Sequence, residues 1–131
     1  MNRKHILVVD DELNILATYR AILERNGYNV STASTVLEAR QVLTERKVDF
    51  LLCDLTLKEQ GGGLEVLKFA RKTYGPMPAI LLTGYASEED CDRAESLGVP
   101  LLYKPLEVEC LLMTIAGLVR DQELSRVSGE Q

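Results

Sequence analysis

The sequence contains no tryptophan, one histidine and three cysteines, and only 5% of its residues are aromatic. Cys53, Cys91 and Cys110 are odd in number and form no CxxC pair, which argues against a disulfide framework and against a zinc site. Free thiols are typical of a reducing cytosol, so we expect a cytoplasmic protein. The histidine, His5, begins a predicted strand, which favours a structural role.

The sequence also lacks a long hydrophobic run and an excess of positive charge. Its first apolar segment meets Asp10 after a few residues, which is too short for a signal peptide or a membrane span. The net charge of −5 repels phosphate backbones, so direct binding to nucleic acid by this domain is not expected. Length and the absence of linkers and repeats indicate one domain over residues 1–120, followed by a polar, frayed tail over residues 121–131.

Short apolar segments alternate with longer amphipathic ones. The sequence predicts strands over residues 5–9, 28–32, 50–54, 79–83 and 99–103. It predicts helices over residues 11–26, 35–46, 64–74 and 87–97, and a fifth after Pro105 to about residue 120. Apolar strands covered on both faces are typical of parallel sheets. We therefore expect an α/β fold, a doubly wound five-stranded parallel sheet with helices on both faces.

Chemically active side chains follow the predicted strands. Asp10 and Asp11 follow the first strand, Asp54 ends the third, Thr83 ends the fourth and Lys104 follows the fifth. Separately, each has an ordinary explanation as a helix cap, a turn residue or a solvated charge. Ligands of open α/β sheets, however, bind beyond the carboxyl ends of the strands, and all of these residues are expected at that edge. Their coincidence therefore predicts a functional site.

The charges at this edge indicate which ligands would bind there. Three carboxylates and one ammonium leave roughly −2 in one place, which is costly unless a divalent cation is bound. Oxygen ligands favour Mg²⁺, or Mn²⁺. Lys104 and the Thr83 hydroxyl could then bind phosphoryl oxygens, and Asp54 becomes a plausible carboxylate nucleophile. Gly84 would leave room for the phosphoryl group, or is a simple turn glycine.

Taken together, these motifs resemble the receiver domain of bacterial response regulators, over about residues 4–120. The resemblance implies a flavodoxin-like sheet with strand order 2-1-3-4-5. It implies that Asp54 is the phosphoacceptor, that Lys104 pairs with the phosphoryl group, and that Thr83 and Tyr103 form a switch pair. It also implies a cis bond before Pro105. The implied Mg²⁺ ligands are Asp10, Asp11, Asp54 and the backbone carbonyl of Thr56.

The same resemblance implies partners. The phosphodonor would be a histidine kinase or a phosphotransfer protein. A downstream effector or a second copy of the domain would bind the face formed by the fourth helix, the fifth strand and the fifth helix. Thr56 and Tyr85 would flank the path of an attacking water, and Tyr85 would shield the phosphorylated Asp54 and slow its hydrolysis.

The segment after Asp54 departs from the family pattern. It reads Leu57-Lys58-Glu59-Gln60-Gly61-Gly62-Gly63, without the usual Met-Pro pair and one residue longer. We interpret the glycines as a slack connector, because the GKS or GKT sequence of a phosphate-binding P-loop is missing. The departure leaves the loop geometry and the fit to a kinase open.

A phosphorylation switch has three alternatives. A phosphorylation-independent interaction module with the same fold remains the main alternative. A haloacid-dehalogenase-like phosphatase normally carries a D-x-D pattern after its first strand and a lid domain, whereas this sequence has Asp10-Asp11-Glu12. A flavodoxin-like cofactor binder is disfavoured because an anionic cofactor would meet Asp10 and Asp11.

Overall fold

The computed structural model describes residues 3–57 and 62–129. Its sheet has five parallel strands in the order β2-β1-β3-β4-β5. The strands are β1 His5–Val9, β2 Asn29–Ala33, β3 Phe50–Asp54, β4 Ala79–Thr83 and β5 Leu101–Tyr103. The helices are α1 Leu13–Arg25, α2 Val36–Glu45, α3 Gly62–Tyr74, α4 Glu88–Ser96 and α5 Val108–Gly129. The predicted fold class and strand order are confirmed.

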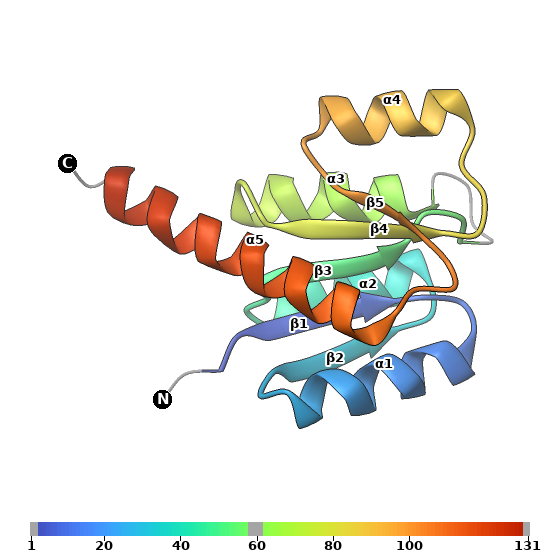
Figure 1. The fold of residues 1–131 in the computed structure, drawn as a ribbon, viewed down its shortest axis with the longest axis horizontal. Coiled ribbons are helices and arrows are strands. Elements are labelled where there is room, and N and C mark those ends of the chain that lie inside the picture. The colour runs from blue at the N-terminus through green and yellow to red at the C-terminus, as the bar shows by residue number, and fades with distance from the viewer. Residues whose placement is uncertain (1–2, 58–61, 130–131) are drawn as a thin grey trace.

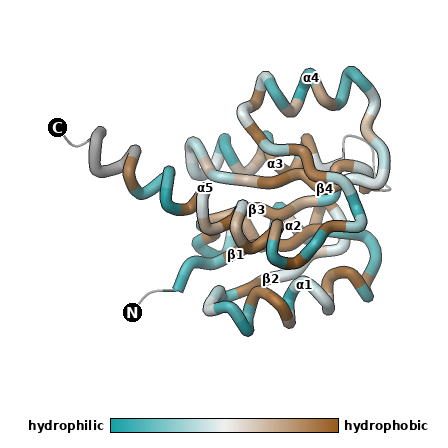
Figure 2. Tube along the Cα trace, in the orientation of Figure 1, coloured by the Kyte–Doolittle hydropathy of each residue, from teal (hydrophilic) through white to brown (hydrophobic). Residues whose placement is uncertain are grey.

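The helices cover both faces of the sheet (Figure 1). Leu16 and Leu23 of α1 join Leu111 and Ile115 of α5 in one buried cluster. The opposite cluster takes its helical members from α2, α3 and α4. Figure 2 shows the hydrophobic residues concentrated along the central strands between these layers. Because both faces are buried, the strands are nearly continuous apolar runs rather than alternating ones.

Two helices begin at residues whose side chains cap the helix. The Thr35 hydroxyl accepts a hydrogen bond from the backbone N–H of Glu38 at the start of α2. Ser87 and Asp90 form a reciprocal capping box at the start of α4, which satisfies backbone groups that a helix N-terminus leaves unpaired. The acidic first turn of α4 further complements the positive end of its dipole.

The glycine segment differs from its predicted role. Gly62 and Gly63 are buried in the first turn of α3, so this part of the segment is not a slack connector, and Gly61 lies outside the described residues. A Cβ added to Gly63 would lie 2.3 Å from the carbonyl oxygen of Asp54, and one added to Gly62 would lie 2.5 Å from that of Leu55. The glycines are required because α3 begins directly against the backbone that follows β3.

The last helix is longer than predicted. It continues past Arg120 to Gly129, because no glycine or proline interrupts residues 121–128 and a polar composition does not prevent a helix. The Gln122 side chain donates a hydrogen bond to the carbonyl of Pro76, and Glu123 lies 3.4 Å from the ammonium of Lys4. In Figure 1, the end of α5 projects beyond the sheet. Among the described residues, no helix is both long and apolar enough to cross a membrane.

Candidate functional site

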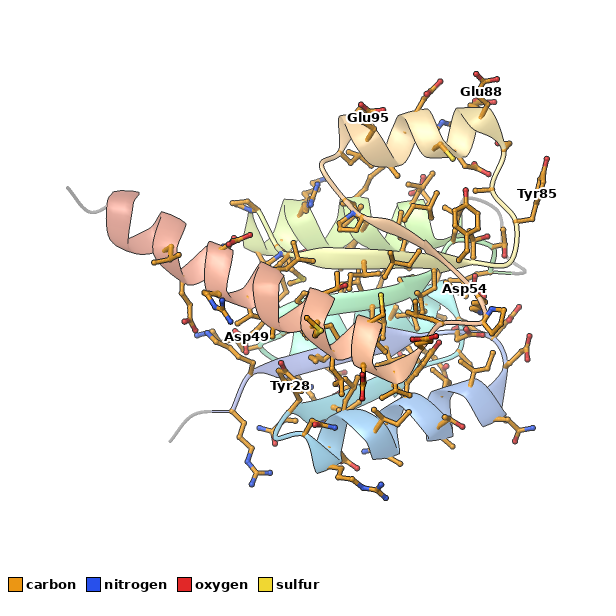
Figure 3. The ribbon with its side chains drawn as sticks, in the orientation of Figure 1. Tyr28, Asp49, Asp54, Tyr85, Glu88 and Glu95 are labelled. Carbon is orange, nitrogen blue, oxygen red and sulfur yellow. The ribbon has the colours of Figure 1, made fainter. Side chains whose placement is uncertain are left out.

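The strand register brings two aspartates together. Val9 of β1 pairs with Cys53 of β3, so the residues that follow, Asp10 and Asp54, lie next to each other. The chain leaves β1 and β3 toward opposite edges of the sheet, and such a switch point leaves a crevice where ligands bind in α/β proteins. Figure 3 places Asp54 at this edge and Asp49, which precedes β3, at the opposite one.

Lys104 connects the two aspartates. Its ammonium lies 2.8 Å from Oδ2 of Asp10 and 3.3 Å from Oδ2 of Asp54. Both aspartates are buried, whereas the Lys104 side chain is 20% exposed. The Lys104–Pro105 peptide bond, which the resemblance implied to be cis, is cis in the structure. The backbone N–H of Lys104 donates to the carbonyl of Thr83, which fixes the lysine beside the end of β4.

Both buried carboxylates also accept hydrogen bonds on their other oxygen. Oδ1 of Asp10 accepts from the backbone N–H of Glu12 at 3.0 Å. Oδ1 of Asp54 accepts from the backbone N–H of Thr56 at 3.0 Å and from its hydroxyl at 3.3 Å. Oδ2 of Asp54 is therefore the oxygen that points toward the Lys104 ammonium and the Asp10 carboxylate.

Burial and charge act in opposite directions on the site's lysine. Burial alone would lower the pKa of Lys104, but its hydrogen bond to Asp10 and the negative charges of Asp10 and Asp54 raise that pKa above its ordinary value. The lysine is therefore a permanent cation at neutral pH. For the neighbouring Cys53, burial, followed by the charges of the two aspartates, raises the pKa of the thiol well above its usual range, so Cys53 is an inert core residue.

The acidic residues at the edge suit a hard cation. Asp10, Asp11 and Glu12 can each offer a carboxylate oxygen, and these oxygens lie within 4.8 Å of one another. An all-oxygen donor set of this kind fits Mg²⁺. Sequence reasoning did not consider Glu12 as a ligand, although its position directly after two aspartates was the available signal. The expected set of Asp10, Asp11, Asp54 and the Thr56 carbonyl stays a prediction.

Thr83 is fully buried at the end of β4. Its hydroxyl donates to the backbone carbonyl of Tyr85 at 2.5 Å and accepts from the Tyr85 backbone N–H at 3.1 Å. In this state the Thr83 hydroxyl is hydrogen-bonded to the backbone of the turn that follows β4. A Cβ added to Gly84 would meet nothing within 4 Å, and the expected role of Gly84 in leaving room for a phosphoryl group stays a prediction.

The two expected aromatic residues both lie at the surface. Tyr103 is 51% exposed, and its hydroxyl oxygen lies 3.6 Å from Sγ of Cys91. Tyr85 is 77% exposed and points into solvent, away from Asp54 (Figure 3). In this conformation, the Tyr85 ring does not cover the carboxylate that it was expected to shield. Thr83 holds the Tyr85 backbone through two hydrogen bonds.

Tyr19 of α1 is a further neighbour of the site. Burial raises the pKa of its hydroxyl, Lys104 opposes that rise, and Asp10 and Asp54 add to it. Tyr19 lines an apolar groove of about 480 Å³ together with Ile15, Ile22, Pro105 and Lys104, among others. The groove therefore opens directly beside the charged centre.

Comparisons with known proteins point to one family. The family model described as the response regulator receiver domain matches residues 6–116. The transcriptional regulatory protein ZraR of Klebsiella oxytoca is 34% identical over 122 residues, which cover 92% of this chain but only 27% of ZraR. The chain thus spans about a quarter of the length of this curated relative.

Two solved structures are similar in fold and sequence. A CheY-like response regulator receiver domain protein from Methanospirillum hungatei JF-1 has a TM-score of 0.87 and 33% identity, covering 95% of this chain and 99% of that chain. A response regulator from Burkholderia pseudomallei has a TM-score of 0.78 and 28% identity, covering 98% of this chain and 75% of that chain. The latter was solved with a phosphorylated aspartic acid, a calcium ion and citrate.

Proposed function

This chain belongs to the response regulator receiver domain family, and on that basis we propose that it is a signalling switch whose Asp54 accepts a phosphoryl group. The observation that carries the proposal is the contact of one lysine with two buried aspartates from adjacent strands. Buried carboxylates are costly without a partner, and a structural ion pair needs only one of them. A second carboxylate directed at the same ammonium supports a site that holds a shared ligand.

The proposed reaction is a direct transfer. A carboxylate oxygen of Asp54 attacks the phosphorus of a phosphohistidine, a P–O bond forms, and the P–N bond breaks as the imidazole leaves and takes up a proton. Lys104 places its positive charge where a phosphoryl oxygen would lie, and the Thr83 hydroxyl and the Gly84 backbone N–H would bind other oxygens. Phosphoryl transfer depends mainly on such positioning and charge neutralisation.

A divalent cation fits this assignment. Asp10, Asp11, Asp54 and the carbonyl of Thr56 would hold Mg²⁺ or Mn²⁺, and the metal would neutralise charge on the phosphoryl oxygens. The donor chemistry supports it, because carboxylate oxygens gather at this edge. The Burkholderia relative, which contains a phosphorylated aspartate and a calcium ion, supports the same combination.

The output would be a change on the α4–β5–α5 face. Phosphorylation adds phosphoryl oxygens, which are strong hydrogen-bond acceptors, beside Thr83. The Thr83 hydroxyl can reach these oxygens only by giving up its hydrogen bonds to the Tyr85 backbone. That movement opens space into which the ring of Tyr103, now exposed, can turn. A partner that prefers one arrangement of this face would then respond to phosphorylation, because a ligand shifts two states only through its differential affinity for them.

We assign two classes of partner to separate surfaces. A histidine kinase or phosphotransfer protein must approach Asp54, and the apolar groove beside Lys104 offers it a docking surface. An effector, or a second copy of the domain, would use the α4–β5–α5 face. With a net charge of −5, the domain would act through proteins rather than by contacting nucleic acid or a membrane itself. The three free cysteines support a cytoplasmic setting.

The acceptor assignment is tested by labelling with radioactive acetyl phosphate in the presence of Mg²⁺. The wild-type chain should incorporate phosphate, and Asp54→Asn should not. Asp92→Asn is a matched control, because Asp92 is an exposed aspartate on α4. Labelling of Asp54→Asn at the wild-type rate would refute the assignment.

The same assay separates the alternatives. A folded wild-type protein that never becomes labelled would support the phosphorylation-independent interaction module, which the unusual segment after Asp54 keeps in consideration. Steady turnover of small phosphate esters would instead indicate a phosphatase.

A further inference from the structure

Helix α4 is attached to the domain by little apolar contact. Ala94 is the only buried side chain among the nine described residues of this helix. In Figure 1, α4 lies at the margin of the molecule, and in Figure 2 it is largely hydrophilic. Glu88 and Glu95 point outward from it (Figure 3). A helix with so small a buried face depends on specific polar contacts for its position.

Two such contacts join α4 to the rest of the structure. At its C-terminal end, the guanidinium of Arg71 on α3 donates a hydrogen bond to the carbonyl of Leu97. Nearer its N-terminal end, the thiol of Cys91 contacts the hydroxyl of Tyr103 on β5. The first contact is made to a backbone atom and does not involve the switch residues. The contact between Cys91 and Tyr103 does involve them, because Tyr103 is one of the two residues of the expected switch pair.

We propose that Cys91 is a positioning residue of the switch, whose thiol holds Tyr103 in its outward position and so opposes activation. The inference rests on the proposed function, because it concerns the same movement of Tyr103. The ring cannot turn toward the space beside Thr83 and keep its hydroxyl against Cys91. The contact between Cys91 and Tyr103 therefore exists only in the outward state. Its full free energy stabilises that state relative to the inward one.

The size of the effect follows from the strength of the contact. A single hydrogen bond to a neutral side chain is modest, so removing it should raise the ratio of inward to outward states by about two- to fivefold. A ligand that binds the inward state should gain apparent affinity by the same factor, since its measured affinity scales with the fraction of competent protein.

Beryllofluoride, an analogue of the phosphoryl group, provides the ligand for the test. Its apparent affinity in Mg²⁺ should rise by about two- to fivefold in Cys91→Ala and in Tyr103→Phe. The double variant should gain no more than either single one, because both changes remove the same contact. Cys91→Ser keeps a donor and an acceptor and should restore part of the wild-type behaviour. Cys110→Ala, at an exposed cysteine on α5, should change nothing.

A ligand-free measurement separates this inference from the proposed function. In protein with labelled tyrosines, the ring signal of Tyr103 is identified as the one missing in Tyr103→Phe. The hydrogen bond between Tyr103 and Cys91 raises the pKa of Tyr103, as expected where the phenol O–H donates to the sulfur. Cys91→Ala should therefore move this signal and lower that pKa, whereas Cys110→Ala should not.

The outcomes are distinct. A wild-type chain that binds no beryllofluoride would count against the proposed function, while the ring signal would still report on the contact. An unmoved ring signal in Cys91→Ala, or additive effects of the two single variants on affinity, would overturn the role of Cys91.

Discussion

Lys104 is the residue on which both the electrostatics and the proposed chemistry of the site depend. Its ammonium contacts Asp10 and Asp54, so Lys104→Met keeps the length of the side chain and removes only the charge. Loss of one positioned charge at a reacting centre typically slows the reaction on the order of 100-fold, and we expect labelling by acetyl phosphate to slow by that amount. Lys68→Met, at an exposed lysine on α3, is the control. Equal labelling rates in the two variants would contradict the assignment.

The same lysine makes a prediction about alkaline pH. Its pKa is raised in the folded protein, so its contribution to stability is complete below the unfolded value of 10.5 and is lost as pH rises through the folded value. Tyr28 also has a raised pKa and adds the same alkaline destabilisation to the wild type and to Lys104→Met. Lys104 opposes the rise in the pKa of Tyr19, so Tyr19 is replaced by phenylalanine in both proteins compared. Urea unfolding followed by circular dichroism should therefore show a steeper alkaline loss of unfolding free energy in the wild type than in Lys104→Met. Parallel curves would rule this contribution out.

The start of α3 makes a prediction at the scale of an element. Gly63 and Gly117 both lie inside helices, but a Cβ on Gly63 meets the backbone of Asp54, whereas one on Gly117 meets nothing within 4 Å. Gly63→Ala should lower the free energy of unfolding by about 1–3 kcal/mol. Gly117→Ala should raise it by about 0.5–1 kcal/mol. Chemical unfolding measures the free energy of unfolding of both variants. Equal changes in the two variants would show that α3 is not tightly packed against the end of β3. The carbonyl oxygen that the new Cβ would crowd belongs to Asp54. We therefore also expect Gly63→Ala to slow the labelling of Asp54 by acetyl phosphate.

The elements differ in how far the sequence reveals them. β1, β3 and β4 have the predicted bounds, because a strand covered on both faces is an uninterrupted apolar run. The predicted start of α3 was wrong. Gly62 and Gly63 are required there because a side chain would collide with the backbone that follows β3, which local helix propensity does not reveal. Composition indicates that glycine adds freedom, but it does not indicate that a side chain would collide with a distant segment.

At the scale of the whole molecule, topology determines which distant residues meet. The order β2-β1-β3-β4-β5 places Asp10 and Asp54 side by side, and a doubly wound sheet with this order makes their meeting predictable from the strand ends alone. The state of the switch was less predictable. The exposure of Tyr85 and the contact of Tyr103 with Cys91 depend on side-chain rotamers and on the position of α4, for which the sequence contains no local signal.

Magnesium should stabilise the fold as a whole, because an ion that binds only the folded state shifts unfolding by mass action. At about 100 times its Kd, Mg²⁺ should add about 2.7 kcal/mol to the free energy of unfolding, and a chelator should remove that gain. NaCl at equal ionic strength controls for screening. Asp11→Asn should lose most of the gain, whereas Glu12→Gln should keep it if Asp54 rather than Glu12 completes the site. A loss in Glu12→Gln as large as that in Asp11→Asn would instead assign the ion to the cluster of Asp10, Asp11 and Glu12, beside the phosphoacceptor rather than on it.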